Sequence, residues 1–368
     1  MRRINKVLFM FIILVAIFII SLTLSNKSPV FNGKVNDLKN KFYGKTLNKE
    51  FKTKIKAGNL STDYLIEQAL RDIDKLQLNT VNIPVVIHIK DLKATDMTVD
   101  EESKKKAVEL IKRLRWKKIN IILEAYPWID NGKQYETEWK PVDINKFFDN
   151  WKSKVIKNLI DDIAVPYHVD ALNVASNFIN MESYEASWID IIDYVRQYYK
   201  GLITYRTNWW YKTEDFNKKL NNKLFSKVDF ISIAAYFELS NKDINTAYEL
   251  TEAIKSTTAH KRKQNIEQQL KEFHDKWQKP IFFGELGFPR RNGAAREPWN
   301  PEPTKIENVL EQANCFEAYR RIFEDKPWHL GFSVFAIGET SENKNYYPSE
   351  ESIDIIRKWY KNNNISER

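Results

Sequence analysis

The chain has 368 residues, a net charge of +9 and one cysteine, Cys315. Its length suits one large domain or two of ordinary size, and a single cysteine excludes an internal disulfide and a cysteine-based metal cluster. The positive charges form no dense block interleaved with aromatic residues, which argues against nucleic-acid binding.

The N-terminus combines positive charge with an apolar run. Arginine and lysine residues precede residues 7–24, which are almost wholly apolar, and about 18 such residues suffice to span the core of a bilayer. The segment that follows lacks the Ala-x-Ala pattern of a cleavage site. We therefore predict an uncleaved signal anchor in residues 1–25, with a cleaved signal peptide as the alternative, and a polar stalk in residues 26–50. The expected location is the extracellular face of a bacterial cell membrane, or the medium after cleavage.

Residues 51–365 alternate between strand and helix patterns. Short apolar runs bounded by breakers predict strands, and apolar residues at helical spacing predict the helices between them. The expected strands are 54–58, 80–87, 119–126, 171–178, 202–207, 228–236, 280–285 and 328–337. The expected helices are 61–76, 98–117, 143–164, 187–199, 245–277, 312–323 and 353–360. Eight strands alternating with helices predict one α/β domain, a (β/α)8 TIM barrel. A doubly wound sheet is the alternative, but the chain has no glycine-rich phosphate loop.

The ends of the predicted strands, with the loops just beyond them, carry acids, amides and aromatic rings. The carboxyl ends of barrel strands are where catalytic groups lie. The residues concerned are Glu124, Trp128, Asn177, Asn208, Trp209, Tyr236 and Glu285. Carboxylates beside amides and aromatic rings are typical of a polysaccharide cleft. Trp128, Trp139 and Trp299 are either platforms for sugar rings or anchors for their loops. The long loop from 128 to 142 is aromatic and acidic, and such loops are usually functional.

Glu285 is the candidate nucleophile. It lies between Gly284 and Gly287 at the end of an apolar strand, which is a poor position for a packing residue. Glycoside hydrolysis uses two carboxyl groups, about 5–5.5 Å apart when the anomeric configuration is retained. Tyr236, on the preceding strand, is placed to hydrogen-bond Glu285 and to hold it ionised and oriented. A salt bridge from Glu285 to Arg290 is the non-catalytic alternative.

From about residue 52 to residue 340 the sequence resembles glycoside hydrolase family 113, which includes β-mannanases. The resemblance lies in residues 204–209 and 231–237, in the Gly-Glu-Leu-Gly-Phe of residues 284–288, and in a small-residue run that ends at Trp299. It implies retention, with Glu285 as the nucleophile and Tyr236 as its support. It also implies sugar contacts from the 204–209 motif, through Tyr205, Asn208 and Trp209.

One position departs from the family pattern. Where the family resembles Gly-Thr-Glu-Leu, with the acid/base glutamate in third place, this chain has Asn177. An amide does not donate the required proton, and general acid catalysis contributes about 10²–10⁴-fold. A neighbouring carboxyl, Glu182 or Glu124, can take the role. Otherwise the substrate is an activated glycoside, or a base is supplied from elsewhere, or the barrel binds sugar without hydrolysing it. Glu182 equally suits the N-terminus of the following helix, and Glu124 equally suits a sugar hydroxyl.

We therefore predict an exported, monomeric glycoside hydrolase that acts on a β-linked mannan-like or cell-envelope polysaccharide. No cofactor is expected, and no metal ion, because His88 and His168 have no partners at ligand spacing. The rival prediction is a carbohydrate-binding or envelope-assembly protein built on the same barrel. A third is a scaffold that binds an anionic polymer through its basic surface.

Overall fold

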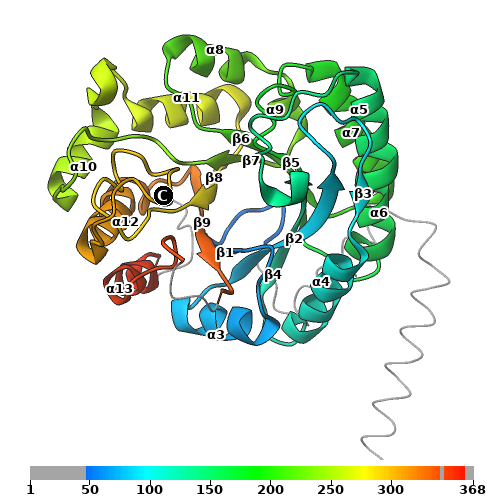
Figure 1. Cartoon of the computed structure of the whole chain (residues 1–368), viewed down its shortest axis with the longest axis horizontal. Coiled ribbons are helices and arrows are strands. Elements are labelled where there is room, and N and C mark those ends of the chain that lie inside the picture. The colour runs from blue at the N-terminus through cyan, green and yellow to red at the C-terminus, as the bar shows by residue number, and fades with distance from the viewer. Residues whose placement is uncertain (1–46, 340–343, 361–368) are drawn as a thin grey trace, which may run out of the picture. The chain divides into compact units, whose positions relative to one another are not determined.

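The computed structural model of the protein describes residues 47–339 and 344–360 (Figure 1). The predicted signal segment, residues 1–25, and most of the predicted stalk lie outside this part. Among the described residues, no helix has both the length and the apolar character needed to cross a bilayer.

Within the described residues, eight parallel strands close into a barrel. The strands are β1 (Ile55–Leu60), β2 (Thr80–Ile89), β4 (Asn120–Ile129), β5 (Ala171–Ser176), β6 (Leu202–Asn208), β7 (Phe230–Ala234), β8 (Ile281–Leu286) and β9 (His329–Ile337). Closure is made by β1, which pairs in parallel with both β2 and β9. A two-residue strand, β3 (Thr98–Val99), runs antiparallel to β2. The predicted (β/α)8 barrel is confirmed, and the doubly wound sheet is excluded.

Helices surround the barrel (Figure 1). Their bounds are α3 (Ile66–Leu76), α4 (Glu101–Leu114), α5 (Ile144–Asn150), α6 (Lys157–Leu159), α7 (Glu185–Tyr198), α8 (Thr213–Asn221), α9 (Leu224–Lys227), α10 (Ala247–Lys255), α11 (Ile266–Trp277), α12 (Val309–Phe323) and α13 (Glu350–Lys358). The helix predicted over 245–277 is two helices, because α10 ends at Lys255 and Asn265 caps the start of α11. Two π-helical turns flank α6 inside the helix predicted over 143–164.

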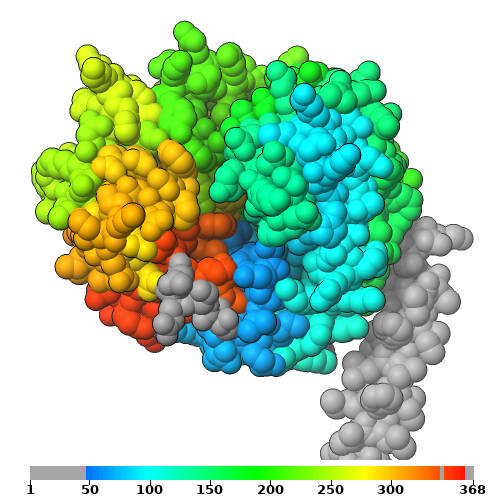
Figure 2. Space-filling view, in the orientation of Figure 1, coloured from blue at the N-terminus to red at the C-terminus, as the bar shows by residue number. Residues whose placement is uncertain are grey.

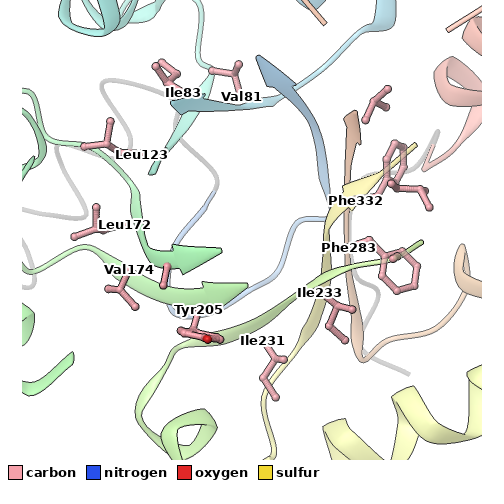
Figure 3. Close-up of a cluster of buried hydrophobic side chains, with 14 of the residues drawn as sticks. Val81, Ile83, Leu123, Leu172, Val174, Tyr205, Ile231, Ile233, Phe283 and Phe332 are labelled. Carbon is pink, nitrogen blue, oxygen red and sulfur yellow. The ribbon is translucent and has the colours of Figure 1, made fainter. Parts of the chain in front are cut away.

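The larger core lies between the barrel and its helices. Alternate side chains along a strand point to opposite faces, and Figure 3 shows the outward-facing set. It includes Val81, Ile83, Leu123, Leu172, Val174, Tyr205, Ile231, Ile233, Phe283 and Phe332, all of them buried. Burying this surface is the main force that holds the helices against the sheet.

The inside of the barrel changes character along its axis. Near the amino ends of the strands a smaller cluster fills it with apolar side chains: Leu47, Ile55, Ala57, Ile122, Ala171, Leu202, Phe230, Phe282 and Leu330. Two residues further along β4 and β5, on the same face, come Glu124 and Asn173, which are also buried. Two residues before the end of β6 comes Arg206, likewise buried. The lumen is therefore polar toward the carboxyl ends of the strands, where barrel enzymes carry their active sites.

Candidate active site

A buried arginine between two carboxylates forms the centre of the site. Arg206 Nη1 donates to Glu285 Oε1 at 2.6 Å, and Arg206 Nη2 donates to Glu124 Oε2 at 2.5 Å. The side chains of Arg206, Glu124 and Glu285 are 3%, 7% and 12% exposed. Three strands, β4, β6 and β8, thus contribute to one ionic cluster in the lumen. Glu285 is its most accessible member, as a nucleophile must be.

Gly284 makes room for this arginine. A Cβ atom at residue 284 would lie 1.9 Å from Ser232 Oγ and 2.7 Å from Arg206 Nε. The carbonyl of Gly284 also accepts a hydrogen bond from Asn59 Nδ2 at 2.7 Å. A larger residue at 284 would therefore displace the guanidinium from between its two carboxylates.

Tyr236 follows β7 and lies beside Glu285. Its phenol lies close enough to Glu285 to feel the charge of that carboxylate. Its ring packs edge-on against Trp209 at 5.4 Å between centroids, and against Phe335 and Tyr346. Burial, with the negative charge of Glu285, raises the pKa of Tyr236 well above its ordinary value, so the hydroxyl stays protonated and able to donate.

Asn177 stands next to Glu285, one residue beyond the end of β5. Its φ of 60° lies in the left-handed region, which asparagine tolerates better than most residues. The side-chain nitrogen, Nδ2, donates to Glu285 Oε1 at 3.2 Å and to Glu136 Oε1 at 3.1 Å. The amide therefore links the carboxylate of β8 to a second acid, which comes from the long loop after β4.

That second acid, Glu136, is the functional candidate that the sequence analysis did not single out. Its side chain is partly exposed. Desolvation of the carboxyl group and the negative charge of Glu285 raise the pKa of Glu136 to about 7. The sequence signal was the length and the aromatic, acidic character of the loop from 128 to 142. That signal marks a functional loop but does not say which of its acids enters the site.

The loop is held to the barrel by a buried tryptophan. Trp139 is fully buried, and its Nε1 donates to the carbonyl of Ala94 at 3.0 Å. Its ring packs edge-on against Phe147, at 5.0 Å, and against Phe178, at 5.5 Å. Because Phe178 follows Asn177 directly, the same contact fixes the loop that carries Glu136 relative to Asn177. Of the two roles predicted for Trp139, the structure therefore favours that of a loop anchor.

Glu182 and Glu124, the two acids predicted as substitutes for Asn177, are both held by hydrogen-bond partners within the protein. Glu182 accepts hydrogen bonds from Lys219 Nζ at 2.8 Å and from Thr207 Oγ1 at 2.7 Å, and both contacts lie within a buried polar cluster. Glu124 lies in the site, but its Oε2 is shared by Arg206 and Asn173.

Tyr205, which we predicted to contact sugar, is fully buried. Its ring packs at 5.2 Å from that of Trp188 on α7 and at 6.1 Å from that of Phe225 on α9. Because successive side chains on a strand point to opposite faces, the adjacent Arg206 points into the lumen and Tyr205 points outward.

The rim carries aromatic rings and unsatisfied amide oxygens. Trp128 and Trp209 are partly exposed, and Trp299 is 45% exposed with its Nε1 bonded to Glu238 at 2.9 Å. Among the described residues, the buried Oδ1 atoms of Asn177 and Asn208 accept no hydrogen bond. A hydroxyl-rich ligand would supply the donors that these acceptors lack.

The surface over this end of the barrel is hollowed. Figure 2 shows the hollow between the amber segment near residue 300 and the mint-green segment around residues 130–140. The loops after β8 and β4 therefore border one concave face.

Comparisons with known proteins agree with this architecture. The model of Glycoside Hydrolase Family 113 matches residues 50–358. A β-mannanase of that family from Alicyclobacillus acidocaldarius, in complex with ManMIm, superposes with a TM-score of 0.68 at 16% identity, over 83% of this chain and 96% of that one. A β-1,4-mannanase of the same family superposes with a TM-score of 0.67 at 19% identity, over 84% of this chain and 99% of that one.

A more distant structure is a family 5 mannosidase from Rhizomucor miehei, with a TM-score of 0.54 at 10% identity, over 83% of this chain and 92% of that one. A comparison with curated protein sequences finds no match. At these identities the structural likenesses establish the fold, while the family rests on the match to its model.

Proposed function

The chain belongs to glycoside hydrolase family 113, and from this premise we propose that it hydrolyses a β-linked, mannan-type polysaccharide with retention, using Glu285 as the nucleophile. The ion pair of Glu285 with Arg206, at the accessible end of the lumen, is the observation that carries the proposal. The substrate class is supported by the relatives named as β-mannanase and β-1,4-mannanase.

Two donors orient the nucleophile. Arg206 and Asn177 hydrogen-bond the Glu285 carboxylate, and the Tyr236 phenol lies beside it. These contacts restrict its rotation and direct one oxygen toward the anomeric carbon, and positioning of this kind supplies a large part of the catalytic effect. Attack forms a covalent glycosyl ester, which water then hydrolyses.

The rim suits a chain of several sugar units. Trp128, Trp209 and Trp299 present rings on which the C–H faces of sugars stack, and the bond from Trp299 Nε1 to Glu238 fixes the ring plane. Asn208 supplies an unsatisfied acceptor for a sugar hydroxyl. The proposed substrate is therefore a polysaccharide or a long oligosaccharide.

Export is part of the proposal and rests on the sequence. Residues 1–25 have the charge and apolar length of a signal anchor. Residues 26–50 have the polar composition of a stalk. The barrel, acting as a monomer, would then meet its polysaccharide outside the cell membrane, or in the medium if the segment is cleaved.

A second function is favoured by one observation, the amide of Asn177 at the position where the family resemblance places an acid. On this alternative the protein binds a polysaccharide without cleaving it. The two functions share the rim and differ in whether Glu285 forms a covalent bond.

Turnover separates the two functions. Hydrolysis of β-1,4-mannohexaose and of 2,4-dinitrophenyl β-mannoside would be measured for the wild type and for Glu285→Ala. We expect both substrates to be hydrolysed by the wild type and neither by the variant. Mannohexaose binding measured by calorimetry, with no turnover of either substrate by the wild type, would refute the hydrolase and support the binding protein.

A further inference from the structure

One amide group bridges two carboxylates in the site. Asn177 Nδ2 donates to Glu136 Oε1 at 3.1 Å and to Glu285 Oε1 at 3.2 Å. The two N–H bonds of a planar amide diverge by about 120°, so linear hydrogen bonds of these lengths correspond to acceptor oxygens about 5.5 Å apart. That ideal separation is close to the roughly 5–5.5 Å between the two carboxyl groups of retaining glycosidases, and below the roughly 6.5–9.5 Å of inverting ones.

We propose that Glu136 is the general acid/base of this site and performs, from the loop after β4, the role that the residue at the end of β5 cannot. The inference rests on the proposed hydrolase function. Asn177 then becomes a positioning residue that sets the spacing of the two carboxyl groups.

The reaction balances with these two acids. A Glu285 oxygen attacks the anomeric carbon while the glycosidic C–O bond breaks, and the leaving oxygen takes the proton from the Glu136 carboxyl. In the second step the Glu136 carboxylate takes a proton from water as the water oxygen bonds to the anomeric carbon. The bond from the anomeric carbon to Glu285 breaks in the same step, and both carboxyl groups return to their starting states.

The electrostatics of the site suit this exchange of roles. Glu136 faces the carboxylate of Glu285, the guanidinium of Arg206 and the phenol of Tyr126. Burial and the charge of Glu285 raise the pKa of Glu136 to about 7, while Arg206 acts in the opposite direction. When Glu285 is esterified its negative charge disappears, so the pKa of Glu136 falls and the residue becomes the base that the second step needs.

The other two candidate acids are less suitable. The Glu124 side chain is 7% exposed, and its Oε2 accepts from Arg206 and Asn173. Burial raises its pKa too, but these donors bind the carboxylate form and the group lies below the rim. Glu182 is paired with Lys219 at 2.8 Å in a separate buried cluster. Of the three, Glu136 alone is both partly exposed and linked to Glu285 through one side chain.

The precision that acid catalysis demands comes from the loop anchor. Three residues after Glu136, Trp139 is fully buried, and its backbone N–H donates to the carbonyl of Glu136 at 3.2 Å. Asn180 Nδ2 donates to the carbonyl of Trp139 at 3.0 Å, which ties the two loops together. The proposed acid is thus held by packing and hydrogen bonds on both sides of the site.

The test compares Glu136→Gln with Glu138→Gln, which removes an exposed acid two residues away in the same loop. We expect Glu136→Gln to lower kcat/KM on β-1,4-mannohexaose by about 10²–10⁴-fold. On 2,4-dinitrophenyl β-mannoside, whose leaving group needs no proton, kcat/KM should stay within about tenfold of the wild type. Azide, a nucleophile that needs no base, should raise kcat and give β-mannosyl azide. Glu138→Gln should behave as the wild type on both substrates.

The pH profile gives a second readout. The fall of wild-type kcat/KM above about pH 7 should disappear in Glu136→Gln and persist, at a lower rate, in Glu136→Asp, which keeps the carboxyl. Unchanged mannohexaose turnover in a folded Glu136→Gln, or no azide product, overturns the inference and leaves the hydrolase proposal intact. If the wild type hydrolyses neither substrate, both proposals fail together.

Discussion

Replacing Arg206 by methionine would remove the cation that two buried carboxylates share. Losing one partner of a buried ion pair typically costs 3–5 kcal/mol, because an uncompensated charge is left inside. Glu285 keeps Asn177 as a donor and is the more exposed of the two acids, so Glu124, with a side chain 7% exposed, bears most of the loss. We therefore expect the free energy of unfolding of Arg206→Met to fall by about 3 kcal/mol at pH 7.5, the lower end of that range.

The loss should depend on pH in one direction. Without Arg206 the folded-state pKa of Glu124 rises further above its unfolded value of about 4.3. The native state then holds a proton that the unfolded state has released, so the deficit is small near pH 4 and grows as the pH rises. Urea unfolding of the wild type and of Arg206→Met at pH 4.5 and pH 7.5 measures this deficit in the free energy of unfolding. Adding Glu124→Leu should restore most of the stability, because an apolar replacement of the pair leaves no buried charge.

Arg321→Met is the matched control. It breaks the pair with Glu317, in which the arginine side chain is 44% exposed, and pairs of this kind contribute less than about 1 kcal/mol. A deficit for Arg206→Met that is equal at both pH values, or no larger than that of Arg321→Met, would refute the assignment of a buried charge cluster to the centre of the barrel.

Three further substitutions test the surroundings of the site. Tyr236→Phe removes the hydroxyl beside Glu285. If that hydroxyl donates to the carboxylate during the reaction, the loss is about 1.5–3 kcal/mol, and kcat/KM should fall about 10–150-fold with little change in Tm. Trp139→Ala should destabilise the protein by about 3–5 kcal/mol in urea unfolding. It should also expose the 128–142 loop to hydrogen exchange. Trp299→Ala should raise KM for mannohexaose more than for mannobiose, with Tm unchanged. Equal KM changes on both substrates would indicate that Trp299 anchors its loop and is not a platform for a sugar ring.

Much of the site was predictable because a parallel barrel brings its strand ends together. Once Glu285 and Tyr236 were assigned to consecutive strands, their contact followed from the fold. Gly284 was noted only as a neighbour of Glu285, and its function, making room for Arg206, needed the structure.

The error at Tyr205 was avoidable. Asn208 and Tyr205 are three residues apart on one strand, so alternation sends them to opposite faces. If Asn208 faces the lumen, so does Arg206, and Tyr205 packs outward against the helices. The period-2 rule, applied along the whole 204–209 motif, would have found the arginine.

Glu136 and the division of the 245–277 helix were harder to predict. A long loop has no period that fixes which side chain points inward, and the position of Glu136 depends on burial of Trp139 against Phe178, a contact between distant segments. The helix predicted over 245–277 ran through residues 256–265, which separate the two helices, and the side-chain cap of Asn265 marks where the second helix begins.

The central claim is that Glu285 attacks the anomeric carbon. The most direct test is to incubate the protein with a 2-deoxy-2-fluoro-β-mannosyl fluoride and to map the labelled peptide by mass spectrometry. This reagent forms the glycosyl ester quickly, and water then hydrolyses that ester slowly. The account predicts a single fluoromannosyl adduct on Glu285. A label on any other residue, or no label on a protein that hydrolyses mannohexaose, would contradict it.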